Sequence, residues 1–349
     1  MAKISSVKAA AAMLLALSCT GGLAQGSTQP AQPASTVSPT LNAVKARGNL
    51  VCGVIGSSAG FSLPDNQGVM QGIDADACRA IAAAVFGDPS KVKFVSLTAQ
   101  QRLTALQSGE VDVVYANFTW TMSRETRSGV QFATVHYYDG AGFIVPTQLK
   151  VTTATKLRGA TVCMLAGPAE VVAQEYFSKH KLTYKTVTFS DGEELRKAFL
   201  SKRCDAYLSD QSSLAKFRGT LGANASNFLL LPEVISKEPL GGAVRKGDDR
   251  WYDIVRYAHF AMVTAEEMGI NSANAKSFSS TDPAVKRFLG QEGELGASMG
   301  LDNRWAINVV ASVGNYGEVW DRHFGTSGLN RGLNRLWSEG GLMYSPPLR

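Results

Sequence analysis

The sequence lacks the patterns on which metal, phosphate and nucleic-acid chemistry usually depend. It contains no Gly-Lys-Ser or Gly-Lys-Thr phosphate loop. Its Lys and Arg residues are spread along the chain, so the formal net charge of +6 does not indicate a nucleic-acid-binding face. Only four histidines occur, without metal-ligand spacing, at His136, His180, His259 and His323. We therefore expect no metal, no cofactor and no nucleic-acid partner.

A search for nucleophilic catalysis gives a similar result. The segment Gly296–Gly300 matches the Gly-x-Ser-x-Gly pattern of a nucleophile elbow. That elbow requires a preceding apolar strand, which this sequence does not have. We therefore predict no catalytic residue and no enzyme activity.

The first 24 residues have the layout of a secretory signal peptide. Lys3 and Lys8 precede an apolar run from Ala9 to Leu17, which is too short to span a membrane. Small residues up to Ala24 then lead into a polar stretch. We expect cleavage near Ala24, export of the mature protein and a flexible spacer over 25–40. An imperfect lipoprotein-type site at Cys19 leaves a lipid anchor as the alternative.

Cysteine is scarce, and four of the five cysteines follow the leader. They are Cys52, Cys78, Cys163 and Cys204. An even number of cysteines in an exported protein favours disulfides, with four buried thiols as the alternative. Four cysteines allow three pairings, and the sequence does not choose among them.

The remaining chain is long enough for two domains, and its composition, with 45% hydrophobic and 18% charged residues, is that of a soluble globular protein. Hydrophobic runs from Leu50, Val92 and Val111 predict three strands. Asp74 is expected to cap a helix between the first two, and Thr98 with Gln101 forms a capping box for another. Alternating strands and helices predict an α/β fold with a parallel sheet, whose ligands bind at the carboxyl ends of the strands. The loop over 116–124 lies at such an end.

The same series recurs further along the chain. Strands are predicted over 161–164, 184–188 and 205–208, a helix over 169–178, and a second helix capped by Ser190 with Glu193. A shift of 93 residues places Asp112 on Asp205 and Asn117 on Asp210. We interpret this as two similar α/β lobes facing one cleft, with chance similarity as the alternative.

Five motifs in this order resemble the periplasmic solute-binding proteins of polar and general L-amino-acid ABC transporters. The motifs occupy 72–80, 104–113, 117–121, 236–241 and 331–337. The resemblance covers 41–349 and implies a type II clamshell of two lobes, a periplasmic location, a membrane permease as partner and a monomeric protein. It also implies lobe 1 over 41–142 plus 242–349, lobe 2 over 143–241, and hinge segments over 137–146 and 235–243.

A zwitterionic amino acid presents a carboxylate and an ammonium, and burying either one unpaired costs several kcal/mol. A guanidinium donates two parallel hydrogen bonds to a carboxylate, and a carboxylate pairs with an ammonium. The resemblance assigns the first role to Arg124 and the second to Asp210, with Asn117 and Thr119 lining the lobe 1 loop.

The sequence departs from the family pattern at the same cleft. Ala116 stands where an Arg is common, and the segment over 166–169, Ala-Gly-Pro-Ala, replaces a hydroxyl-rich turn. The Ala169 N–H, at a helix start, remains able to bind a carboxylate. These changes favour a ligand with less polar substituents or a different headgroup. The candidates for an apolar wall are Phe61, Phe118, Trp120 and Tyr138.

Three functions follow from these observations. The first is capture of a small amino-acid-like solute for an ABC permease. The second is a dehydratase-like periplasmic enzyme on the same fold, which would require a carboxylic acid or His beside the ligand, and the sequence alone shows none. The third is a ligand-reporting protein that docks on a signalling receptor.

Overall fold

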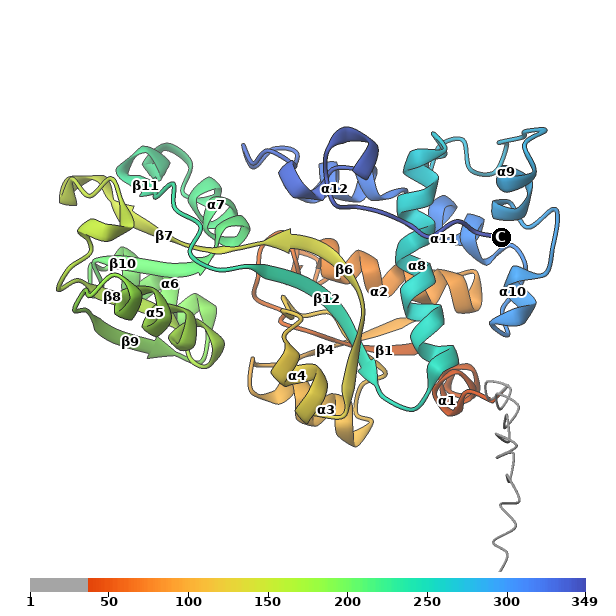
Figure 1. Cartoon of the computed structure of the whole chain (residues 1–349), viewed down its shortest axis with the longest axis horizontal. Coiled ribbons are helices and arrows are strands. Elements are labelled where there is room, and N and C mark those ends of the chain that lie inside the picture. Colours follow the sequence, from red (N-terminus) through yellow and green to blue (C-terminus); the bar gives the residue numbers. More distant parts are fainter. Residues whose placement is uncertain (1–36) are drawn as a thin grey trace, which may run out of the picture. The chain divides into compact units, whose positions relative to one another are not determined.

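Two five-stranded sheets organise the protein, whose computed structural model describes residues 37–349 as part of one compact unit (Figure 1). We define lobe 1 as the sheet with strand order β4-β1-β5-β12-β6 and its helices, and lobe 2 as the sheet with order β11-β7-β10-β8-β9 and its helices. The lobe 1 strands are β1 (Leu50–Val54), β4 (Val92–Ser96), β5 (Val113–Val114), β6 (Val130–Asp139) and β12 (Glu238–Arg245). The lobe 2 strands are β7 (Ala141–Pro146), β8 (Thr161–Leu165), β9 (Lys185–Phe189), β10 (Ala206–Asp210) and β11 (Phe228–Leu230).

Helices surround both sheets. Those of lobe 1 are α1 (Pro39–Arg47), α2 (Ile73–Phe86), α3 (Gln101–Ser108), α4 (Met122–Arg127), α8 (Asp249–Glu267), α9 (Pro283–Phe288), α10 (Leu295–Ser298), α11 (Trp305–Val313) and α12 (Tyr316–Phe324). Those of lobe 2 are α5 (Pro168–Lys179), α6 (Gly192–Leu200) and α7 (Gln211–Thr220). Strands β2 (Leu63–Pro64) and β3 (Met70–Gln71) form a small hairpin. Within 37–349, no helix has both the length and the apolar character to cross a membrane.

The leader, the cleavage point and the Cys19 alternative lie outside the described residues. The last residues of the expected spacer, 25–40, are helical, because α1 starts at Pro39. Ser38 caps this helix by accepting from the Leu41 N–H at 3.0 Å. The Asp248 carboxylate accepts from the Ser38 hydroxyl at 2.9 Å and from the Thr40 N–H at 2.8 Å. The end of the expected spacer is thus fixed to the start of α8.

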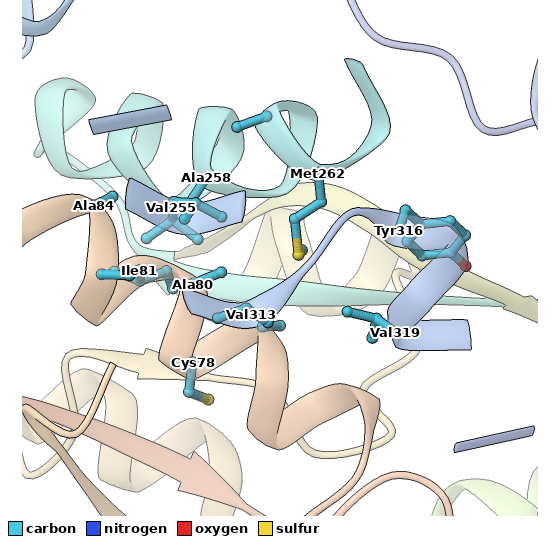
Figure 2. Packing of buried hydrophobic residues seen from close by; sticks show 14 of the residues in the cluster. Cys78, Ala80, Ile81, Ala84, Val255, Ala258, Met262, Val313, Tyr316 and Val319 are labelled. Atoms are coloured by element: carbon cyan, nitrogen blue, oxygen red, sulfur yellow. The ribbon is translucent and has the colours of Figure 1, made fainter. Parts of the chain in front are cut away.

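The main core lies in lobe 1, where α2, α8, α11 and α12 pack together (Figure 2). Ile81 of α2 and Met262 of α8 are almost fully withdrawn from water and face this core, as does Val313 of α11. Each large apolar side chain buried here contributes roughly 1.5–3 kcal/mol. The core holds the long C-terminal part of the chain against the first βαβ unit.

Both sheets are mixed, which corrects the expectation of a purely parallel sheet. β1 pairs in parallel with β4 and β5, and β8 with β9 and β10, as the alternating pattern predicts. β12 is antiparallel to β5 and β6, and β7 is antiparallel to β10 and β11. β7 and β12 each begin where the chain crosses from one lobe to the other. Their antiparallel direction therefore follows from the crossover and not from a βαβ unit.

Two crossover segments join the lobes side by side. Gly140 separates β6 from β7, and Glu238, the first residue of β12, pairs with Asp139, the last residue of β6. A Cβ on Gly140 would lie 2.2 Å from Val234 and 2.7 Å from the Ser236 carbonyl oxygen. Glycine therefore allows the two crossovers to touch. The exact lobe ranges given above stay a prediction.

Two expected helix caps are wrong. α2 begins at Ile73 after Gly72, and Asp74 makes no cap because its side chain points into the protein. α6 is capped by Asp191 and not by Ser190, since the Asp191 carboxylate accepts from the N–H groups of Glu193 and Glu194. The Thr98 and Gln101 capping box is present, with the Gln101 side chain accepting from the Thr98 N–H at 2.9 Å.

The internal repeat has a counterpart in the structure. Asp112 accepts from the N–H of Val51 at 2.8 Å, and Asp205 accepts from the N–H of Thr161 at 2.8 Å. Each carboxylate thus ties the residue before one strand to the neighbouring parallel strand, β1 in lobe 1 and β8 in lobe 2. The four cysteines form two disulfides, Cys52 with Cys78 and Cys163 with Cys204, which selects one of the three pairings and places one bridge in each lobe.

Candidate functional site

A cavity of about 300 Å³ is lined by residues of both lobes at the carboxyl ends of their parallel strands. Asn117 and Thr119 follow β5, Ala166 follows β8, and Asp210 ends β10. This volume lies at the lower end of the range for small-molecule sites. Arg124, Asp210, Asn117, Thr119 and Ala169 all belong to the lining, so the structure brings together five of the eight predicted site residues.

Arg124 is held in place by the loop that precedes it. Thr121 caps α4, and its hydroxyl accepts from the Arg124 N–H at 3.3 Å. The guanidinium donates to the Thr119 carbonyl oxygen at 2.5 Å and lies over the Phe118 ring, 4.8 Å from its centroid. Desolvation lowers the pKa of Arg124, while the charges of Glu238 and Asp210 raise it. Guanidinium pKa values lie far above neutrality, so the group remains a cation that is fixed in direction.

A buried hydrogen-bonded pair of side chains fixes the backbone of Asn117. Asp74 accepts from the Asn117 N–H at 2.9 Å with one carboxylate oxygen, and the other lies 2.6 Å from His136 Nε2. Both side chains are almost fully buried. Asn117 adopts φ of 47°, a left-handed conformation that Asn tolerates better than most residues. The predicted capping residue Asp74 therefore supports the cavity wall instead.

Three carboxyl groups meet where Asp210 faces the crossovers. Desolvation raises the pKa of Asp210 well above its usual value, and the charges of Asp139 and Glu238 add to this. Hydrogen bonding from Asn117 and the charge of Arg102 lower the pKa of Asp210 in part. Desolvation likewise raises the pKa of Asp139 to about 6, against hydrogen bonds from Ser212 and the Gly140 N–H. An ammonium group placed here would be stabilised by all three carboxyl groups.

Glu238 joins the cavity to the hinge. It accepts from the Thr119 hydroxyl at 2.6 Å and from the Ser236 hydroxyl at 2.5 Å, and Ser236 in turn accepts from the Ala141 N–H at 3.0 Å. One hydrogen-bonded chain thus runs from a cavity-lining residue to both crossovers.

Arg102 is a second guanidinium in the lining, and the sequence did not single it out. It is 5% exposed, donates to the Asn117 carbonyl oxygen at 3.2 Å, and lies 5.7 Å from the centroid of the Phe118 ring. Its buried Nε has no hydrogen-bond partner among the described residues. Desolvation and the nearby charge of Arg124 lower the pKa of Arg102 to about 10, so it is still cationic at neutral pH. Two guanidiniums on one wall make this side of the cavity attractive to a carboxylate.

The aromatic residues expected to form an apolar wall lie elsewhere. Phe61 is fully buried against Tyr137 and Phe324, and Phe118 is 1% exposed beneath the two guanidiniums. Trp120 stacks on Phe132 and donates to the Glu125 carboxylate at 2.7 Å. The structure does not bring these residues, or Tyr138, into the lining. Apolar lining comes instead from Phe217 and from smaller side chains, among them Ile55, Leu165 and Val172.

The Ala-Gly-Pro-Ala segment over 166–169, which departs from the family pattern, lines the cavity at the start of α5. Gly167 precedes the helix at φ of 106°, and the Glu170 carboxylate accepts from its N–H at 2.8 Å. Ala169 is the second residue of the helix, whose first N–H groups have no partner within the helix. The Ala166 carbonyl oxygen accepts from the Gln100 side chain at 3.1 Å, which connects this turn to lobe 1.

Comparison with known proteins identifies the family of this chain. The sequence model of the bacterial extracellular solute-binding proteins, family 3, matches residues 50–275, a range that contains strands of both sheets. The chain belongs to this family. Its fold is the expected type II clamshell, and this solute-binding protein carries the cavity where the two lobes meet.

Several relatives match nearly the whole chain. The glutamate/glutamine/aspartate/asparagine-binding protein BztA of Rhodobacter capsulatus is 48% identical, over 89% of this chain and 93% of that protein. The general L-amino acid-binding periplasmic protein AapJ of Rhizobium johnstonii is 47% identical, over 89% and 93%. The solved structure of an ABC transporter periplasmic binding protein from Brucella ovis with glutathione bound has a TM-score of 0.86 at 46% identity, covering 89% of this chain and 99% of that one.

Sequence reasoning missed Arg102, Arg196, Asp139 and Glu238. A signal was available for two of them. Arg102 follows the capping box at the carboxyl end of a predicted strand, and Glu238 lies inside one of the family motifs, at 236–241. Asp139 lies inside the predicted hinge segment 137–146, but its charge was not connected to the site. Arg196 carried no signal, because it reaches the cavity through the packing of α6.

Proposed function

We propose that this solute-binding protein holds an amino-acid-like solute between its lobes and delivers it to the permease of an ABC transporter. One observation carries the proposal: Arg124 of lobe 1 and Asp210 of lobe 2 line the same cavity. A guanidinium and a carboxylate suit the two charged groups of a zwitterion. Because they come from different lobes, only a closed protein satisfies both ligand groups, so ligand binding favours closure.

The names of the relatives support this class of ligand. BztA is named for glutamate, glutamine, aspartate and asparagine, AapJ for L-amino acids in general, and the Brucella protein was solved with glutathione. All these ligands have an α-carboxylate and an α-ammonium group. We infer that the ligand of this chain shares that headgroup.

Each remaining residue has a distinct proposed role. Arg102 supplements Arg124 at the carboxylate, and the Asn117 and Thr119 side chains offer further polar contacts. The Ala169 N–H approaches the same carboxylate from lobe 2, favoured by the dipole of α5. The acids Asp139 and Glu238 add negative potential near the ammonium-binding Asp210.

The proposed location is the periplasm, where a leader removed near Ala24 would leave the protein. The intact mass of the protein purified from its native envelope measures the cleavage point. A mass that begins at Cys19 and includes a lipid would replace the soluble form by the anchored one.

Ligand screening and uptake test the proposal together. The purified chain is screened by thermal shift against the L-amino acids, glutathione, organic acids and amines, because a ligand that binds the folded form raises the melting temperature. Hits are then measured by calorimetry, and uptake of the labelled hit is compared in cells with and without the gene. We expect amino-acid hits and loss of uptake. A screen in which no amino-acid-type compound raises the melting temperature contradicts the proposal.

A second candidate is an enzyme on the same fold, and one observation favours it. Asp210 lines the cavity, and desolvation raises its pKa well above the usual value, so it can serve as the carboxylic acid that a dehydratase requires, a group that the sequence alone did not reveal. Incubation of each hit with the protein, followed by mass spectrometry, separates the two functions. Recovery of the ligand unchanged supports binding without chemistry, and loss of water from it supports the enzyme.

A further inference from the structure

The charged groups that line the cavity within the described residues are three guanidiniums, Arg102, Arg124 and Arg196, and two carboxyl groups, Asp210 and Glu238. A third acid, Asp139, acts on Asp210 from outside the lining. The two charged groups of a zwitterionic ligand are proposed to pair with Arg124 and Asp210. Arg196 forms an ion pair with none of these acids and is therefore available to a further negative charge on the ligand.

Arg196 lies on α6, within lobe 2. Its guanidinium donates to the Ser57 carbonyl oxygen of lobe 1 at 3.3 Å. It also lies near the Tyr207 phenol, whose pKa is raised by desolvation and lowered in part by Arg196. Neither partner is an anion, and none of the ion pairs among residues 37–349 includes Arg196.

The first residue of α6 creates the space that Arg196 occupies. A Cβ on Gly192 would lie 3.3 Å from the Arg196 Nη1 and 3.6 Å from the Ser57 hydroxyl. The arginine thus folds back over a residue without a side chain and reaches the cavity, instead of extending into solvent as Lys197 does.

Hydroxyl groups complete this part of the lining. Ser58 and Ser213 approach each other across the lobes with their hydroxyl oxygens 3.4 Å apart, and Tyr207 contributes its phenol. Hydroxyls and a guanidinium without an acidic partner are the donors that bind a carboxylate. The acids of the site are instead gathered around Asp210 and the crossovers.

We propose that Arg196, with Ser57, Ser58, Ser213 and Tyr207, forms a second carboxylate-binding subsite that makes the cavity prefer ligands with an acidic group beyond the amino-acid headgroup. This inference rests on the proposed function and specifies its ligand class. An acid and its side-chain amide have nearly the same shape, so the subsite distinguishes them by charge.

Calorimetry on acid and amide pairs tests the subsite. The pairs are aspartate and asparagine, glutamate and glutamine, and 2-aminoadipate with its side-chain amide, measured on the wild-type protein and on Arg196→Gln. We expect at least one acid to bind the wild type at least tenfold more tightly than its amide. In Arg196→Gln, the affinity for that acid should fall at least tenfold, while the affinity for the amide changes less than threefold. Arg196→Lys keeps the charge but loses the planar arrangement of donors, so its affinity for that acid should lie between those of the wild type and Arg196→Gln.

Arg203→Gln is the matched control, because Arg203 lies in the same lobe, is exposed and packs on Phe189 outside the cavity lining. Equal losses for acid and amide in Arg196→Gln would show that Arg196 only holds the lobes together through Ser57, and would overturn the subsite. A wild-type protein that binds neutral amino acids but none of the acids would also overturn the subsite, and it would leave the proposed function unaffected. A wild type that binds no amino acid at all would overturn both.

Discussion

At the scale of single residues, the cavity depends on polar groups whose directions are fixed by neighbouring residues of the protein. The Arg124 and Arg102 guanidiniums both lie over the Phe118 ring, and the Asn117 N–H donates to Asp74. Fixed donors lose little conformational entropy when a ligand binds, so their hydrogen bonds contribute more to affinity. The aromatic residue predicted as a wall thus acts as a support for the two cations.

Replacing Arg124 by Ala tests its proposed role directly. The ligand carboxylate would lose charge-assisted hydrogen bonds in a desolvated site, so the affinity should fall by about 2–5 kcal/mol, measured by calorimetry. Arg127→Ala is the control, since Arg127 lies on the same helix and is exposed. An unchanged affinity in Arg124→Ala would remove this residue from the binding site.

The pKa of Asp139 predicts how the stability of the protein changes with pH. Because its pKa is raised from 3.8 to about 6, the folded protein binds more protons than the unfolded chain between these values. The free energy of unfolding should therefore fall as the pH rises from about 4 to about 6, and the contribution of Asp139 should be constant above that range.

Urea unfolding of the wild type and Asp139→Asn across this pH range measures the effect. As the pH rises through this range, the unfolding free energy of the wild type should fall relative to that of Asp139→Asn. Asp321→Asn, at an exposed position of α12, serves as control. A wild type and an Asp139→Asn variant with parallel pH profiles would contradict the raised pKa.

At the scale of elements, the sequence predicted most of the strands and helices but not every detail of their ends. Thr98 and Gln101 were identified as a capping box because both partners of that motif are close in sequence. Asp74 was misassigned because its true partners, Asn117 and His136, are distant in sequence. Local patterns reveal local hydrogen bonds, whereas a buried hydrogen bond between distant residues depends on the packing of the whole lobe.

The start of α2 gives a prediction at this scale. Gly72 has φ of 128°, and a Cβ there would lie 2.0 Å from the Phe61 carbonyl oxygen. Gly72→Ala should lower the unfolding free energy by about 3 kcal/mol or more, since it adds backbone strain and a clash. Gly68→Ala is the control, with φ of 79° and open space around it, and should cost about 1 kcal/mol. Equal effects in urea unfolding would contradict the close contact.

At the scale of the whole molecule, the sequence revealed the division into lobes but only part of the cavity. The 93-residue repeat correctly placed Asn117 and Asp210 on opposite sides of one cavity, because equivalent strand ends face each other in similar lobes. It did not reveal Arg196, whose side chain folds back over Gly192 to reach the cavity. The aromatic wall was wrongly expected because a large apolar residue in a loop has the same pattern whether it faces a cavity or the core.

The cross-lobe contacts indicate how closure is stabilised. Lys216 of lobe 2 donates to the His323 carbonyl oxygen of lobe 1 at 2.7 Å, and Gln100 of lobe 1 donates to Ala166 of lobe 2. These bonds are few, and each contributes only about 1 kcal/mol. The ligand must therefore supply much of the free energy of closure through its two charged ends.

The measurement that tests this claim most directly is calorimetry with the tightest amino-acid ligand and two truncated analogues, one without the carboxylate and one without the ammonium. If Arg124 and Asp210 grip opposite ends of one molecule, each analogue should bind at least about 100-fold more weakly, because a charged group of the site is left unpaired in either case. An analogue that binds as tightly as the complete amino acid would contradict recognition of one ligand by both lobes.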